Sequence, residues 1–146
     1  MGEISPVFRD QPRSLPADLR RSWRVGLVLI LVDACRGHNA SRFQVQALAW
    51  IMLRPKLRQS LAQLLSPSDS LASPTVDLAI ERALDLATGS GFLEETQKGR
   101  LALTVVGQEA LRQIHDLDLF RVERETLSSL PSRFSQTDAD RMFRLK

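Results

Sequence analysis

The sequence of 146 residues is poor in the side chains on which many functional sites depend, with one cysteine, two histidines and no tyrosine. A single thiol cannot form an internal disulfide, so a small secreted scaffold held by disulfides is excluded. Cys35, His38 and His115 fall one ligand short of a structural zinc site. With 43% apolar residues the chain is too hydrophobic to be intrinsically disordered, and its length fits one domain with one core.

A long hydrophobic run is also missing. The strongest apolar stretch, residues 25–32, is shorter than the roughly 20 apolar residues that a membrane-spanning helix needs. Arg20, Arg21 and Arg24 precede it, as in a signal peptide, but the stretch is short and starts late, and Asp33 stands beside the only cleavage-like site. The sequence therefore predicts a cytoplasmic protein.

Catalytic motifs are absent as well: there is no glycine-rich phosphate loop, no nucleophile elbow and no cluster with metal-ligand spacing. Glu94 and Glu95 are neighbours on a predicted strand, so they point to opposite faces and cannot act as a carboxylate pair. Cys35 follows the most apolar segment and is interpreted as a small core residue. The sequence predicts no enzyme, no metal site and no cofactor.

The charge is distributed unevenly. Residues 1–66 hold ten Lys/Arg and four Asp/Glu, a net charge of +6, whereas residues 67–146 hold ten and thirteen, a net charge of −3. Such a basic front would meet phosphate or an acidic partner, which the acidic back would avoid. A mixed solvated surface is the alternative interpretation, and the sequence leaves both open.

Apolar spacing and turn residues predict a mainly helical chain. Three prolines make residues 1–18 an extended arm. The first helix is apolar on nearly every side, which is typical of a central, buried helix. Ser41, Thr104 and Thr137 are the predicted N-caps of three helices. Helices are predicted over residues 20–36, 42–53, 56–65, 76–88, 104–114 and 118–130, and a short one after Thr137.

Two of these helices have a predicted inward face, and a hairpin lies between them. The helix at 76–88 has the buried stripe Val76, Ile80, Ala83, Leu84 and Ala87. The helix at 104–114 turns Val105, Ala110, Leu111 and Ile114 inward. Residues 92–96 and 100–103 flank a glycine-containing turn and predict a hairpin. The fold class is thus mainly α with a small two-stranded β-hairpin, an α+β protein.

This order of elements resembles a winged helix-turn-helix domain. The stretches that carry the likeness are GFLEE at 91–95 and GRLALTVVGQEAL at 99–111. They are similar to the family's wing, a "G-[FL]-[IL]-E" strand followed by a "G-R-x-x-L-T-x-x-G-x-x-A-L" return. The resemblance implies a winged-helix domain over residues 19–115 and a C-terminal helical extension over residues 116–146.

A narrower resemblance starts from the stretch RVGLVLILVD at 24–33. It is similar to the opening helix of the small middle component of bacterial three-component ABC-ATPase systems, which include Lamassu-type anti-phage operons. The resemblance implies a non-catalytic accessory subunit, docked on an SMC-like ATPase and an effector protein in anti-phage defence. Two alternatives stay open: a dimeric winged-helix transcriptional regulator that binds promoter DNA, and a helical domain whose hairpin only imitates a wing.

The helix that would enter the DNA groove carries the wrong charge for that role. Asp77, Glu81 and Asp85 recur every four residues and would face phosphate, and no Asn, Gln or arginine pair is placed to read bases. A solvated acidic face is one interpretation; a protein partner is the other. The predicted partner-binding residues are Asp77, Glu81, Asp85, Phe120, Leu127 and Phe143. Non-specific, salt-sensitive contacts to the DNA backbone are predicted for Arg42, Arg54, Lys56, Arg58, Lys98 and Arg100.

Overall fold

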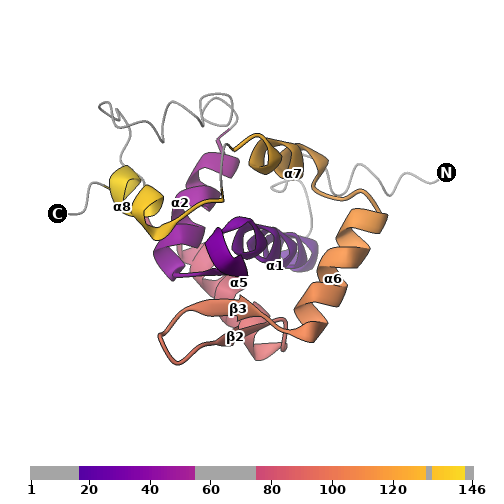
Figure 1. Ribbon diagram of the computed structural model, residues 1–146. Helices are drawn as coiled ribbons and strands as arrows, with labels where there is room; N and C mark the ends of the chain where they lie inside the picture. The colour runs from indigo at the N-terminus through magenta and orange to yellow at the C-terminus, as the bar shows by residue number, and fades with distance from the viewer. Residues whose placement is uncertain (1–16, 55–74, 131–132, 144–146) are drawn as a thin grey trace.

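The computed structural model of the chain describes residues 17–54, 75–130 and 133–143. Over these residues the protein is mostly helical, with a small antiparallel sheet (Figure 1). The elements, in chain order, are α1 (Ala17–Ala34), the 3-10 turn η3 (Arg36–His38), β1 (Asn39–Ala40), α2 (Arg42–Met52), α5 (Leu78–Gly89), β2 (Leu93–Glu95), β3 (Leu101–Leu103), α6 (Val105–Asp116), α7 (Arg121–Ser128) and α8 (Gln136–Phe143). In these segments no helix is long and apolar enough to cross a membrane.

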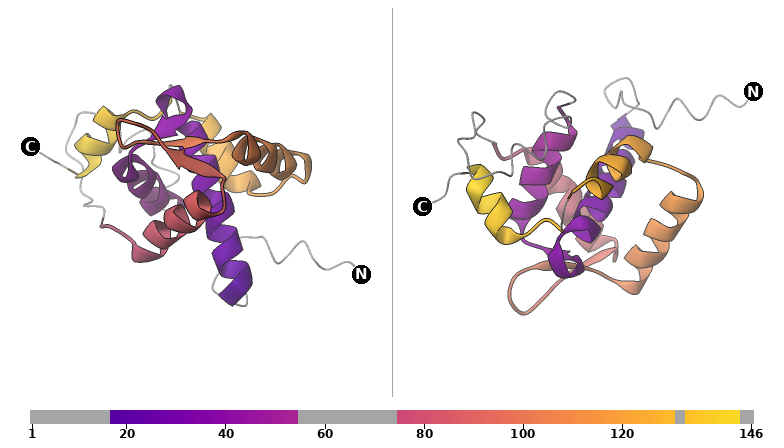
Figure 2. Two further views of the ribbon diagram at one scale, coloured as in Figure 1. Left: turned by 90° about the horizontal axis from the view of Figure 1, so that it is seen from below. Right: turned by 45° about the horizontal axis from the view of Figure 1, so that its top comes forward.

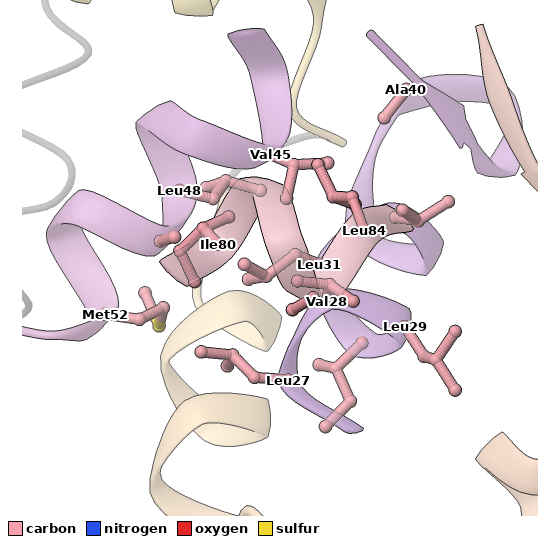
Figure 3. Packing of buried hydrophobic residues seen from close by; sticks show 14 of the residues in the cluster. Leu27, Val28, Leu29, Leu31, Ala40, Val45, Leu48, Met52, Ile80 and Leu84 are labelled. Atoms are coloured by element: carbon pink, nitrogen blue, oxygen red, sulfur yellow. The ribbon is translucent and has the colours of Figure 1, made fainter. Parts of the chain in front are cut away.

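Helix α1 is the centre of the molecule, as its apolar sequence predicts. Figure 1 shows it between α2 and α8 on one side and α6 and α7 on the other. Residues 27–32 are all buried. Figure 3 shows Val28 and Leu31 beside the inward-facing side chains of α2 and α5. The helix stops at Ala34, before the predicted end, because Cys35 adopts an extended backbone. The described residues therefore form one hydrophobic core, which is built around α1.

The sheet has three strands, in the order β1-β3-β2, where the sequence predicts two. Strands β2 and β3 form the expected hairpin, and Gly99 in its turn has the positive φ of 76° that favours glycine. The additional strand, β1, pairs Asn39 with Ala102 and Ala40 with Leu101. Two residues are too few to show the alternation that identifies a strand in a sequence. The prediction of two strands is therefore wrong, because it omits this short edge strand.

Helices α2 and α5 begin where capping chemistry places them. Ser41 forms a capping box with Gln44, which confirms its predicted role. Asp77 caps α5, so this helix starts at Leu78, and Val76 lies outside it and is exposed rather than buried. Ile80 and Leu84 are fully buried as predicted. The predicted inward face is therefore wrong at the start of the helix, because a residue that precedes the first turn does not lie on the periodic buried face.

The predicted helix at 118–130 is shorter at its start, because Asp118 and Phe120 have left-handed backbones with φ of 54° and 57°. These two residues reverse the chain between α6 and α7. The Phe120 ring then packs against Trp23 of α1, with the ring centres 5.3 Å apart. Its edge lies so close to Gly26 that a Cβ there would be 2.9 Å from the ring. The glycine in α1 thus makes room for the aromatic residue that anchors α7.

The C-terminal segment shares this core. Phe134 is fully buried, and its backbone pairs with the end of α1: its carbonyl accepts from Arg36 N at 2.7 Å and its N–H donates to Ala34 O at 3.3 Å. Helix α8 then packs against α2, and it is capped by Ser135 rather than by the predicted Thr137, since the Ser135 Oγ accepts from Asp138 N. The C-terminal helix is therefore tied to the same core as α1 and α2.

Candidate functional site

The acidic residues of α5 are used largely within the chain. Asp77 accepts the Ala79 N–H at 2.8 Å and so closes the N-terminus of the helix. Glu81 and Asp85, one and two turns further on, accept the two ends of one guanidinium, that of Arg42 on α2. The row of acidic residues thus has a structural role first. Within it, the Asp85 side chain is more exposed than that of Glu81.

Arg42 holds α2 and α5 together. Its Nη1 lies 2.7 Å from Glu81 Oε1, and its Nη2 lies 2.8 Å from Asp85 Oδ1. The hydrogen bond to Asp85, followed by that to Glu81, raises the pKa of Arg42. A cation held by two carboxylates has little left for phosphate. Arg42, which the sequence assigns to the DNA backbone, therefore lies in an internal bridge.

A second link between these helices starts from the buried Gln46 on α2. Its Oε1 accepts the Asp77 N–H at 2.9 Å, and its Nε2 donates to the Asp77 carbonyl at 3.0 Å and to Glu81 Oε2 at 2.8 Å. The amide therefore binds both backbone groups of the residue that caps α5. Nothing in the sequence identifies this partner, because Gln46 and Asp77 lie 31 residues apart.

What α5 presents to solvent is largely apolar. Leu78 is 67% exposed and Leu86 is 45% exposed, and Arg82 stands between them at the four-residue spacing that aligns side chains on a helix. Asp85 borders the same face. We define the α5 surface as Leu78, Arg82, Asp85 and Leu86. The four-residue spacing of Leu78, Arg82 and Leu86 marks this face in the sequence, although the partner contacts predicted on this helix are its acidic residues.

Of the two hairpin residues predicted to contact the DNA backbone, only Lys98 is exposed to solvent. Arg100 is half-buried: its Nε donates to Asn39 Oδ1 at 2.5 Å, and its Nη2 donates to Gln44 Oε1 at 2.6 Å. It therefore fastens β3 to β1 and to the start of α2. Lys98, in contrast, is exposed in the turn, which projects from the helices in Figure 2.

The other predicted DNA contacts are divided. Arg54 is exposed at the end of α2, and its guanidinium lies over the Trp50 ring at 4.8 Å and donates to the Trp50 carbonyl at 2.9 Å. Lys56 and Arg58 lie outside the described residues. The structure thus does not bring the predicted cations into one patch with Lys98, since Arg42 and Arg100 are both turned to internal acceptors.

The predicted apolar partner contacts lie apart from α5. Phe120 is 6% exposed and fills the space between α1 and α7, so its ring is part of the core. Leu127 is half-buried on α7 and lines a cavity there. Phe143 ends α8, and its side chain lies outside the described part of the structure. Of the predicted partner-binding residues, Asp85 is the one that belongs to the exposed surface of α5.

The reactive groups of the described chain are inert or dispersed. Burial raises the pKa of the Cys35 thiol from 9.0 to about 12, and its Sγ donates to the Leu31 carbonyl. A thiol so poorly ionised is a poor nucleophile. Among the residues described, no three His, Cys, Asp or Glu side chains gather as metal ligands would.

No family model matches the chain, and neither a curated protein nor a solved structure resembles it significantly.

Proposed function

We propose that this chain is a non-catalytic winged-helix subunit that binds a protein partner through the α5 surface. The order α1, β1, α2, α5, β2, β3 with the sheet order β1-β3-β2 supports the fold assignment. In a winged-helix domain with this arrangement, α5 would occupy the position of the helix that reads DNA. The narrower resemblance of the α1 sequence suggests the partner, an SMC-like ATPase of a bacterial anti-phage system.

The observation that carries the proposal is the composition of the α5 surface. Two leucines with exposures of 67% and 45% flank a single arginine, and the adjacent carboxylate is that of Asp85. A helix lying between two phosphate walls gains its affinity from several cations and reads bases with Arg, Asn or Gln. Exposed leucines at helical spacing instead bury well against another protein. The α5 surface therefore fits a protein better than a DNA groove.

The test uses substitutions that act oppositely on the two kinds of partner. Leu78→Arg and Leu86→Arg add a cation to the α5 surface, so they weaken docking to a protein and strengthen contact with phosphate. We expect each to lower the affinity for the proposed SMC-like ATPase partner by about tenfold or more. Val105→Arg, at an exposed valine of α6, is the matched control and leaves this affinity unchanged.

The measurement is co-purification with a co-expressed SMC-like ATPase, the proposed partner, followed by titration of each variant. Loss of binding for the two α5 variants, with the control intact, supports the proposal. A chain that binds promoter DNA tightly, discriminates it from random DNA and forms a symmetric dimer would instead establish the regulator hypothesis. Equal binding of all variants to the ATPase would place docking elsewhere and refute the role of α5.

Contact with DNA enters the proposal only as a non-specific addition. Lys98 and Arg54 are exposed, and two phosphate contacts would give a salt slope of about −1.8. Affinity for random duplex DNA would then fall about tenfold between 50 and 200 mM salt. Lys98→Glu should remove about half of that slope, as measured by fluorescence anisotropy. A slope that Lys98→Glu leaves unchanged would exclude the hairpin turn from DNA binding.

A further inference from the structure

A cavity of about 330 Å³ lies at some distance from the α5 surface, between the last turns of α1, the end of α6 and α7. This volume is at the lower end of the range for small-molecule sites. Five of its lining side chains are apolar and five are polar or charged. We call the apolar set the wall (Ile30, Ala34, Leu111, Leu127 and Leu130) and the polar set the rim (Asp33, His115, Arg124, Ser128 and Arg133).

Arg124 is held rigidly on the rim. Its Nε donates to the Leu119 carbonyl at 2.8 Å, and its Nη2 donates to Asp118 Oδ1 at 2.5 Å. Its Nη1 lies 3.4 Å from His115 Nδ1. Three partners thus fix the guanidinium before any ligand arrives, which reduces the entropy lost on binding.

His115 and Arg133 add further donors. His115 Nδ1 lies 3.4 Å from Arg124 Nη1, so an imidazole that accepts this N–H at Nδ1 presents Nε2–H as a donor. Arg133 donates through Nη1 to the Asp33 carbonyl. Its other N–H groups have no hydrogen-bond acceptor within the part of the chain that the structure describes. The rim therefore offers several donors to an incoming group.

The acidic group on the rim is already engaged. Asp33 Oδ1 lies 3.0 Å from Nδ1 of His38, which is not among the residues that line the cavity. Arg124 is paired with Asp118, which lies outside the lining, whereas the described residues supply no carboxylate partner for Arg133, so Arg133 is the rim cation left for an incoming anion. An anion with hydrogen-bond acceptors is thus the complementary ligand.

We propose that this cavity binds a small carboxylate with a compact apolar body. The carboxylate would lie at the arginine rim, and the apolar body would lie against the wall formed by α1, α6 and α7. A free inorganic anion would leave that wall uncovered, whereas a neutral apolar molecule would leave the donors unpaired. The inference is independent of partner docking, because the cavity and the α5 surface share no residue.

Benzoate is the probe, and benzamide, which has the same shape without the charge, is its control. Isoleucine methyl groups report binding by NMR: Ile30 lines the cavity, while Ile51 and Ile80 lie elsewhere in the core. We expect a saturable shift of the Ile30 methyl signal with a Kd on the order of 1 mM, as suits a ligand of this size. Benzamide should bind about tenfold more weakly.

Two variants test the site from opposite sides. Arg133→Gln removes a rim charge and should weaken benzoate binding about tenfold. Leu127→Phe fills the cavity without changing a charge and should abolish binding. Arg112→Gln, on the exposed face of α6 where Arg112 pairs with Glu109, is the control and should leave binding unchanged. Unshifted Ile51 and Ile80 signals show that each variant is folded.

The outcomes are decisive in either direction. Saturable binding at Ile30 that depends on the carboxylate, on Arg133 and on free cavity volume establishes the site. Equal shifts with benzamide, no shift at Ile30, or full binding by Leu127→Phe would each overturn the proposal. Since none of these measurements requires the ATPase, failure here is distinguishable from failure of the proposed function.

Discussion

Replacing Gly107 with alanine should destabilise the protein strongly, although alanine is the better helix former. Gly107 lies in the first turn of α6, against the chain that leads into β2. A Cβ built there would be 2.1 Å from the Phe92 carbonyl oxygen and 3.0 Å from a Leu103 methyl group. Carbon and carbonyl oxygen normally stay about 3.3 Å apart or more. The helix and the strand must therefore separate by about 1 Å.

The cost follows from what that separation breaks. The Thr104 N–H donates to the same Phe92 carbonyl at 3.1 Å, and losing this bond costs about 1 kcal/mol. Overpacking of this kind adds about 1–3 kcal/mol, and the helix propensity of alanine returns about 1 kcal/mol. We therefore expect a net loss of about 1–3 kcal/mol, or about 3–10 °C in Tm.

Gly89→Ala is the matched control. Gly89 ends α5, and no atom lies within 4 Å of a Cβ built there. The same substitution should therefore leave the protein unchanged or stabilise it by about 0.5–1 kcal/mol. Urea unfolding followed by far-UV circular dichroism measures both variants. A Gly107→Ala protein as stable as the wild type would show that α6 does not contact the chain before β2.

Three further predictions concern stability. Arg42→Ala should cost about 0.5–1 kcal/mol at low salt and less at about 1 M NaCl, because the bridge to α5 is partly exposed; a cost independent of salt would contradict ion pairing. Phe134→Ala should cost about 3–5 kcal/mol in the same urea assay, and a loss below about 1 kcal/mol would show that the C-terminal segment is peripheral. For Cys35, the unfolded thiol ionises near pH 9 and the folded thiol near pH 12. The free energy of unfolding should therefore fall by about 1.4 kcal/mol per pH unit between these values in the wild type, and comparison with Cys35→Ala isolates this slope.

The sequence predicts those features whose signal is local. The apolar run of α1, the Ser41 capping box and the hairpin around Gly99 each lie within a few residues, and the structure contains all three. The inward face of α5 is likewise correct from Ile80 onward. These features depend on periodicity and turn chemistry, which short segments express by themselves.

Several features that the sequence does not predict depend on distant partners. Strand β1 exists because Asn39 meets Ala102, and Arg100 points inward because Asn39 and Gln44 accept its hydrogen bonds. The charge of Arg42 predicts a free cation, yet the fold places two carboxylates beside it. Composition identifies which groups are charged, whereas tertiary contacts decide which of them remain available to a partner.

Val105 shows the same limit of sequence-based prediction at the start of a helix. The sequence predicts that Val105 faces inward, but it is 81% exposed at the first position of α6. Thr104 caps this helix and bonds the Gly91 carbonyl, so the chain enters α6 from the hairpin side. Leu111 and Ile114, further along, are buried as predicted. The direction in which a chain enters a helix is a property of the whole fold.

The amide of Gln46 has a consequence for how the chain can change in length. It binds both backbone groups of Asp77, so a side chain in the first half of α2 is joined directly to the residue at which the chain enters α5. The entropy of closing a loop between two fixed ends grows only logarithmically with its length. Insertions or deletions between α2 and α5 should accordingly change the free energy of unfolding little, while the two helices keep their positions relative to each other.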